Sequence, residues 1–181
     1  MSVTFVPVTT PEQQVQLAKM AHDIWHEYWP AHIGEAQTDY MVRKYQSLEA
    51  IVESMTEGDE PYEYWFVVSD AEDARGGAPT LPHVVGYTGG HNDAATGRYF
   101  ISKIYLYAEE RGKGYAGSII DHYVALCRQR GFGAMYLTVN KYNELGTRAY
   151  FGRGFKVVDS VVTDIGEGFV MDDYIMEKTV E

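Results

Sequence analysis

Residues 105–117 read Tyr-Leu-Tyr-Ala-Glu-Glu-Arg-Gly-Lys-Gly-Tyr-Ala-Gly, a strand that ends in a glycine-rich turn and continues as a helix. The first amides of a helix lack acceptors within the helix and lie at the positive end of its dipole, so this turn is suited to hold a phosphate group. Gly112 and Gly114 let the backbone approach phosphate oxygens closely, and Arg111 and Lys113 add positive charge. An ordinary helix start with a glycine turn is the alternative that these residues leave open.

The segments on either side of this turn predict an α/β fold with a mixed sheet. A strand over residues 98–107, a helix over 116–130 and a strand over 134–139 form a unit whose two strands pair in parallel. The other strands favour antiparallel hairpins, which gives a mostly antiparallel sheet with a central parallel pair and helices on both faces. The remaining expected elements are strands at 3–8, 62–68, 84–90, 155–163 and 169–176, helices from 10 to about 30, 38–55 and 144–151, and an exposed loop at 70–82.

Length and composition indicate one globular domain over residues 1–181. The apolar fraction is 45% and the charged fraction 23%, which excludes collagen, coiled coil and intrinsic disorder. Cys127 is the single cysteine, so we expect no intrachain disulfide, no cysteine-rich zinc site and a cytoplasmic location. We expect no membrane span, because no run approaches 18 apolar residues, and no signal peptide at the N-terminus.

Charge is unevenly distributed along the chain. The sequence holds 15 Lys and Arg against 26 Asp and Glu, a formal charge of −11, which disfavours nucleic acid as a partner. Residues 103–156 nevertheless carry nine basic and four acidic side chains. A basic segment in an acidic protein suggests an anionic ligand held there, although charges that are close in sequence need not cluster in space.

Three phosphate-binding patterns compete for the glycine turn. Gly112, Gly114 and Gly117 match the dinucleotide pattern G-x-G-x-x-G, but the next strand does not end in the acidic residue that binds a ribose. A Walker A loop fails because Gly114 stands where Ser or Thr is required. Arg111-x-x-Gly114-x-Ala116 resembles the acyl-CoA signature Arg/Gln-x-x-Gly-x-Gly/Ala of the GNAT N-acetyltransferase superfamily.

A second block strengthens this resemblance. Asn143, then Tyr150 seven residues on, then Gly154-Phe155 is similar to the family's downstream motif, and the spacing between the two blocks also fits. The resemblance covers about residues 60–176, and the two expected opening helices fit the family as well. It implies an N-acetyltransferase that transfers an acetyl group directly from acetyl-CoA to a primary amine.

The resemblance also implies roles for individual residues. The turn would hold the pyrophosphate, the preceding strand would pair with the pantetheine arm through its backbone, and Asn143 would bond the arm from the far side. The cofactor residues implied are Tyr105, Leu106, Arg111, Gly112, Lys113, Gly114, Tyr115, Ala116 and Asn143. Tyr150 would be the general acid that protonates the leaving thiolate, and a core tyrosine is the alternative.

The general base and the acceptor are less well defined by the sequence. Candidate bases are His91, Asp93, Glu27 and Glu35. The acceptor would be a small cationic amine in an aromatic pocket, with Asp172 and Asp173 attracting its charge, or these aromatics would simply belong to the core. The candidate pocket residues are Trp25, Tyr28, Trp29, Tyr40, Tyr87 and Tyr174.

The sequence also leaves two other functions open and suggests how the protein assembles. A non-catalytic acetyl-CoA-binding sensor and a nicotinamide-dependent oxidoreductase are the alternatives to an enzyme that acetylates amines. His22 and His26 are spaced i, i+4 on a predicted helix, but without a further ligand cluster we expect no metal site. Final strands in this architecture often pair across a dimer, which suggests a homodimer.

Overall fold

The strands form one sheet in the residues that the structure describes. A computed structural model describes residues 3–70 and 83–181, and within them seven strands are hydrogen-bonded in the order β1-β2-β3-β4-β5-β7-β6. The strands are β1 (Val3–Pro7), β2 (Glu63–Ser69), β3 (His83–Asp93), β4 (Arg98–Leu106), β5 (Ala134–Asn140), β6 (Lys156–Gly166) and β7 (Phe169–Thr179).

Helices and short helical turns connect the strands. They are α1 (Pro11–Tyr28), α2 (Pro30–Ile33), α3 (Glu35–Met41), the π-helix η1 (Val42–Gln46), α4 (Leu48–Thr56), the 3-10 turn η2 (Ala108–Glu110), α5 (Tyr115–Arg130) and α6 (Glu144–Gly152). None of the described helices is long and apolar enough to cross a membrane. The loop expected at 70–82 lies outside the described residues except for its first residue.

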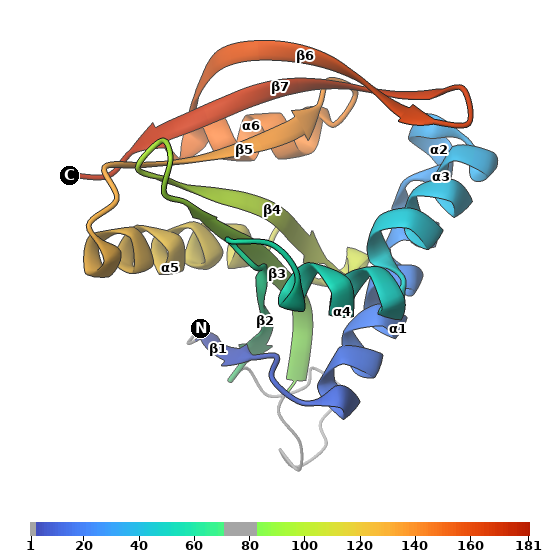
Figure 1. Cartoon of the computed structure of the whole chain (residues 1–181), viewed down its shortest axis with the longest axis horizontal. Helices are drawn as coiled ribbons and strands as arrows, with labels where there is room; N and C mark the ends of the chain where they lie inside the picture. Colours follow the sequence, from blue (N-terminus) through green and yellow to red (C-terminus); the bar gives the residue numbers. More distant parts are fainter. Residues whose placement is uncertain (1–2, 71–82) are drawn as a thin grey trace. The chain divides into compact units, whose positions relative to one another are not determined.

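The chain divides into two compact units, and the first holds the N-terminal helices. It comprises Met1–Gly89 and Lys103–Ile119. Here α1 and α4 pack beside each other over β2 and β3, with Leu17, Ile24, Ile51, Phe66 and Tyr87 in one buried cluster (Figure 1). The predicted capping box opens α1: Gln13 donates its backbone N–H to the Thr10 hydroxyl (3.3 Å), and the Thr10 N–H donates to Gln13 Oε1 (3.0 Å).

The second predicted helix differs from the observed one. We expected one helix over 38–55, whereas the structure has α3, then η1, then a break at Ser47, then α4. Ser47 is extended and accepts a hydrogen bond from the Ala50 N–H (3.2 Å), so it caps α4. The chain therefore leaves one helix and begins the next at Ser47. The apolar spacing on which the prediction relied continues across this break, so the spacing does not reveal it.

The second unit holds the parallel pair and the final hairpin. It comprises Gly90–Ser102 and Ile120–Glu181. β4 pairs with β5 in parallel from Arg98↔Ala134 to Ile101↔Leu137, which confirms the predicted strand-helix-strand unit. β7 pairs antiparallel with both β5 and β6, and Figure 1 shows β6 and β7 as one long hairpin beside β5. The mostly antiparallel sheet with one parallel pair was therefore predicted correctly.

Candidate functional site

The turn that follows β4 has a backbone shape that only glycine adopts easily. Gly112 has φ of 77° and Gly114 φ of 90°, both in the left-handed region that disfavours residues with a Cβ. A Cβ built at either position would meet nothing within 4 Å, so the backbone there borders open space. Consecutive amides around a left-handed turn form a concave anion-binding surface, and the geometry therefore fits a phosphate group.

The helix that starts at this turn is held at its first residue. α5 runs for 16 residues from Tyr115, and the Gly114 carbonyl accepts the Gly117 N–H at 3.0 Å. The Tyr115 hydroxyl donates to Ser69 Oγ at 2.9 Å and thereby fixes the start of α5 to the end of β2. A helix of this length carries the full dipole, whose positive end lies at the turn.

Two cationic side chains of the turn are engaged by protein groups. Glu110 is 4% exposed, and its two carboxylate oxygens contact Lys113 Nζ (3.1 Å) and the His83 ring (2.8 Å). Burial acts to raise the pKa of Glu110, but the hydrogen bonds from His83 and Lys113 together outweigh it and hold that pKa below its usual range. The Lys113 charge is thus directed at a buried carboxylate of the same turn.

Arg111 braces the end of β4 against α1. Its Nε donates to the Leu106 carbonyl (3.2 Å), and its guanidinium lies 4.7 Å from the centre of the Tyr28 ring. Glu27 lies 3.9 Å from the guanidinium and accepts the Ala108 N–H at 3.3 Å. Glu27, one of the candidate bases, therefore supports the turn.

The end of β4 also lies unusually close to β3. A Cβ built on Gly86 would come within 2.2 Å of the Tyr105 carbonyl oxygen and 3.0 Å of Leu106 Cα. Only a glycine at this position leaves room for the backbone of Tyr105 and Leu106. Gly86 thus allows β3 to lie close to Tyr105 and Leu106, the segment that we expect to hold the pantetheine arm.

Most of the predicted aromatic residues form a buried cluster in the first unit. Trp25, Trp29 and Tyr87 are at most 8% exposed, and the Trp25 ring lies 5.3 Å from Trp29 and 5.6 Å from Tyr105. The Tyr28 ring packs edge-on against Trp29 at 5.2 Å. The structure therefore brings these four predicted aromatics together in one packed cluster.

The other two predicted aromatics lie apart from this cluster. Tyr40 is buried beside cations of its own segment, with Lys44 Nζ 5.4 Å from its ring. Tyr174 belongs to the second unit, where Lys141 Nζ lies 5.4 Å from its ring.

One buried cation was missed by the sequence analysis. Lys103 in β4 is 8% exposed, and its Nζ contacts the Tyr45 carbonyl at 3.5 Å. Burial lowers the pKa of this ammonium to about 8. The alternation of Ile101, Lys103 and Tyr105 would have revealed it, because residues two apart on a strand share a face.

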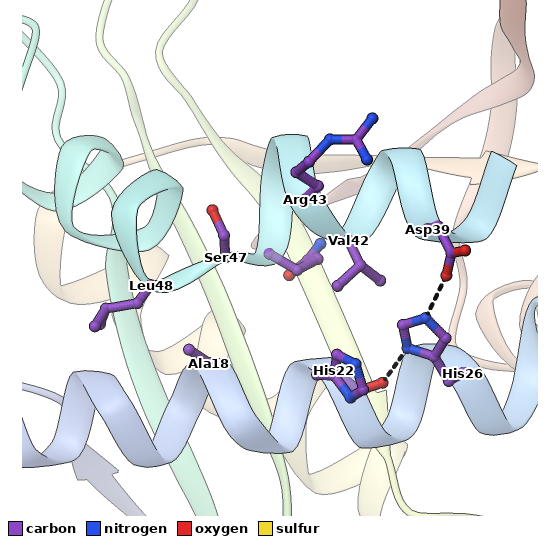
Figure 2. A pocket seen from close by; sticks show the side chains of 9 residues that line it. Ala18, His22, His26, Asp39, Val42, Arg43, Ser47 and Leu48 are labelled. Carbon is purple, nitrogen blue, oxygen red and sulfur yellow. Dashed lines mark hydrogen bonds and ion pairs between the residues drawn. The ribbon is translucent and has the colours of Figure 1, made fainter. Parts of the chain in front are cut away.

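A hollow of about 350 Å³ lies between α1 and the segment from α3 to α4. Figure 2 shows His22 and His26 of α1 beside each other, with His26 pointing at Asp39. His26 Nε2 lies 2.7 Å from the Asp39 carboxylate, which raises the pKa of His26. In the part of the chain that the structure describes, no group of three or more His, Cys, Asp or Glu side chains is arranged to hold a metal ion.

The downstream motif lies in the second unit. Asn143 Oδ1 accepts the Gly146 N–H at 2.9 Å and caps α6. Near the end of α6, Tyr150 packs against Phe155 with ring centres 5.8 Å apart, and the Phe155 N–H donates to the Tyr150 carbonyl (3.1 Å). Tyr150 is partly exposed as a residue, yet burial raises the pKa of its phenol to about 12, so the phenol keeps its proton at neutral pH.

The candidate acids and bases of the second unit differ in how they are engaged. Asp93 accepts the Tyr136 hydroxyl at 2.9 Å, and hydrogen bonds from Thr96 lead the causes that lower its pKa. His91 Nδ1 contacts the Asn92 carbonyl at 2.6 Å. On β7, Asp172 pairs with Lys141 at 2.5 Å, while Asp173 is 4% exposed. Asp93 thus accepts hydrogen bonds from neighbouring residues, whereas Asp173 is buried.

Comparison with known proteins identifies what this arrangement resembles. Residues 20–155, more than half of the chain, match the family described as Acetyltransferase (GNAT) family. No curated protein matches the sequence.

Solved structures share the fold over nearly the whole chain. The structure of a paiA N-acetyltransferase from Thermoplasma acidophilum in complex with coenzyme A is 21% identical, with a TM-score of 0.72, and 99% of each chain is covered. The yncA putative acetyltransferase from Salmonella typhimurium with acetyl-CoA is 13% identical at a TM-score of 0.61, with 100% of this chain and 94% of that chain covered. NAA60 from Arabidopsis thaliana, in complex with a bisubstrate analogue, is 15% identical at a TM-score of 0.62, with 99% and 100% covered.

Proposed function

This chain belongs to the GNAT family of acetyltransferases, and on that premise we propose that it transfers the acetyl group of acetyl-CoA to a primary amine of a small, cationic molecule. The observation that carries the proposal is the turn between β4 and α5, where Gly112 and Gly114 form an open, left-handed backbone surface at a helix start. Structures of similar fold that are described as complexes with coenzyme A or acetyl-CoA support it.

The turn would bind the pyrophosphate mainly through its backbone. In this proposal the amides from Arg111 to Ala116 contact the phosphate oxygens, because the side chains of Arg111 and Lys113 are engaged by α1 and by Glu110. The backbone of Tyr105 and Leu106 would pair with the pantetheine arm, and the closely packed Gly86 keeps that segment in place.

Tyr150 is proposed as the general acid. Its phenol has a pKa of about 12, so at neutral pH it carries the proton that a leaving thiolate requires. Asn143 would contact the pantetheine arm through its amide nitrogen, since its oxygen accepts the Gly146 N–H.

The cationic character of the acceptor rests on charge. The chain has a formal charge of −11, and its acidic side chains lie mostly outside residues 103–156. The aromatic pocket expected from the sequence supports the proposal less, because Trp25, Trp29, Tyr40 and Tyr87 are buried.

The test is acetyl-CoA-dependent release of CoA with a panel of polyamines, aminoglycosides, amino acids and short peptides. We expect turnover on a cationic small amine, and a fall in kcat of about 100-fold or more in Tyr150→Phe. Tyr142→Phe is the matched control, because Tyr142 is 68% exposed in the loop before α6. Turnover that survives in Tyr150→Phe would remove the general-acid role, and acetyl-CoA binding without turnover on any amine would indicate the non-catalytic sensor instead.

A further inference from the structure

β7 buries the carboxyl group of Asp173, and no described residue donates a hydrogen bond to it. Asp173 is 4% exposed, and within residues 3–70 and 83–181 no side chain or backbone N–H donates a hydrogen bond to its carboxyl group. Its neighbour Asp172 is in a different situation, since Lys141 Nζ lies 2.5 Å from Asp172 Oδ1. Lys141, the described cation whose charge acts on Asp173, is thus paired with the other carboxylate.

Strand pairing places Asp173 on a defined face of the sheet. Residues that lie directly opposite in paired strands share a face, so Asp173 lies on the same side as Asn140 of β5 and Val161 of β6. The next residue, Tyr174, pairs with Val139 and points to the other side, as does Met176 opposite Leu137.

The other face is the one that α5 covers. Tyr99 pairs with Met135, and the Tyr99 ring packs against Tyr123 of α5 with ring centres 5.1 Å apart. Met135 and Leu137 are two residues apart and share that covered face. Asp173 therefore projects from the face opposite α5 within this unit.

A buried, unpaired carboxylate is costly to keep. Removing an ionised group from water without a hydrogen-bond donor is strongly unfavourable, so such groups are rare unless a ligand or a reaction uses them. Val161 on one side has no donor in its side chain, and Asn140 on the other, whose Oδ1 accepts the Tyr142 N–H at 2.9 Å, makes no hydrogen bond to Asp173 through its amide nitrogen. The missing partner would be a hydrogen-bond donor with positive charge.

We propose that Asp173 is the catalytic base of the transferase: its carboxylate binds the ammonium group of the acceptor and takes one proton from it. This inference rests on the proposed function, because it assigns a role at the same reaction.

The proton balance of the reaction is then complete. The ammonium gives its first proton to Asp173, which passes it to solvent. The free amine attacks the thioester carbonyl carbon, so that a C–N bond forms and the C–S bond breaks. The nitrogen loses a second proton to solvent, and Tyr150 gives its proton to the thiolate sulfur and is reprotonated from solvent. The net products are the acetylated amine, CoA and one proton.

The ionisation of Asp173 is consistent with this role. Burial, and next the nearby charge of Asp172, raise its pKa to about 6, and Lys141 opposes them. A base whose pKa lies near the operating pH is ionised there and still accepts protons readily. Asp159 of β6 and Glu177 of β7 lie further along the same face, and Glu177 pairs with Arg98 at 2.8 Å.

The experiment compares Asp173→Asn with the wild type in full-length protein, on an amine that the wild type acetylates. We expect kcat/KM for the amine at pH 7.5 to fall about 100-fold or more, with an unchanged Kd for acetyl-CoA. The wild-type profile of kcat/KM against pH should have an acidic limb near pH 6, and this limb should be lost in Asp173→Asn. Asp173→Glu should restore part of the rate and the limb.

Asp159→Asn is the matched control, because Asp159 is an exposed aspartate on the same hairpin and should keep wild-type kinetics. If Asp173→Asn keeps the acidic limb and a rate within about 3-fold of the wild type, the base is elsewhere and the proposed function stands. If the wild type acetylates no amine while binding acetyl-CoA, the proposed function fails and this inference fails with it. Should Asp173→Asn not fold, Asp173→Ser takes its place: loss of the rate and of the acidic limb in a folded Asp173→Ser supports the assignment, and a rate within about 3-fold of the wild type with the limb kept overturns it.

Discussion

Replacing Lys103 with methionine should make the protein more stable at neutral pH. Lys103 is 8% exposed and burial lowers its pKa from 10.5 to about 8. The single described polar contact of its Nζ, the Tyr45 carbonyl at 3.5 Å, is long for a hydrogen bond. Methionine has a similar length, keeps the apolar stem and removes the buried charge.

The magnitude follows from the shift in pKa. One pKa unit corresponds to about 1.4 kcal/mol, so the lowered value sets an upper bound of about 3 kcal/mol on the cost of the buried charge. Loss of the contact with Tyr45 offsets up to about 1 kcal/mol. We expect Lys103→Met to raise the free energy of unfolding by about 2 kcal/mol at pH 7, or Tm by roughly 4–8 °C for a chain of this size.

The pH dependence of stability is a second test of whether Lys103→Met stabilises the protein. Between pH 8 and 10.5 the unfolded chain binds more protons at this lysine than the folded chain, so the wild type gains stability as pH rises through that window. The advantage of Lys103→Met should therefore be full below pH 8 and shrink toward pH 10.5. Urea unfolding of both proteins at pH 7, 8, 9 and 10 measures it, with the exposed Lys156→Met as control. A variant that is less stable than the wild type at pH 7, or an advantage that does not change with pH, would refute the reasoning.

Two further substitutions test local features of the first unit. Gly86→Ala should lower the free energy of unfolding by about 3 kcal/mol or more, because the new Cβ would lie 2.2 Å from the Tyr105 carbonyl oxygen. Gly133→Ala is the control and should lower it by less than about 1 kcal/mol, because a Cβ there meets nothing within 4 Å. Urea unfolding of both variants measures the difference. Asp39→Asn should lower the pKa of His26, because the hydrogen bond that the His26 ring donates to Asp39 is the main cause of its raised value. An NMR titration of the His26 ring would contradict this if the pKa stayed unchanged. The stability that this pair contributes is present below the unfolded pKa of His26 and is lost as pH rises through its folded pKa, so Asp39→Asn should matter more at pH 5 than at pH 8.

Much of the fold could be predicted because the signals are local. The capping box at Thr10 and Gln13 and the glycine turn at Gly112 and Gly114 depend on residues a few positions apart, and both appear as expected. The helix break at Ser47 was not predicted, because the apolar spacing continues through the π-helix η1 and hides the break. The single domain over residues 1–181 stays a prediction, supported by β3, β4 and α5, each of which runs from one unit into the other.

The sequence predicted the part of the candidate site that the backbone forms, which is the glycine turn. It did not predict which charged side chains pair with one another. The glycine pattern alone also permitted a dinucleotide site, and the family match decides in favour of GNAT. That Lys113 would be paired with a buried Glu110, or that Lys141 would pair with Asp172 rather than Asp173, depends on contacts that no spacing encodes. The homodimer and the residue roles in cofactor binding remain predictions.

The contact between Glu110 and Lys113 has a consequence for how this segment can change during evolution. The turn carries its own counter-ion, so the positive side chain at position 113 is balanced before any ligand arrives. In the proposed site, the path of the main chain through two left-handed glycines would therefore select the phosphate. A substitution at position 110 or 113 changes this ion pair and the neighbouring contact of Glu110 with His83, whereas a substitution at either glycine changes the backbone shape of the turn itself.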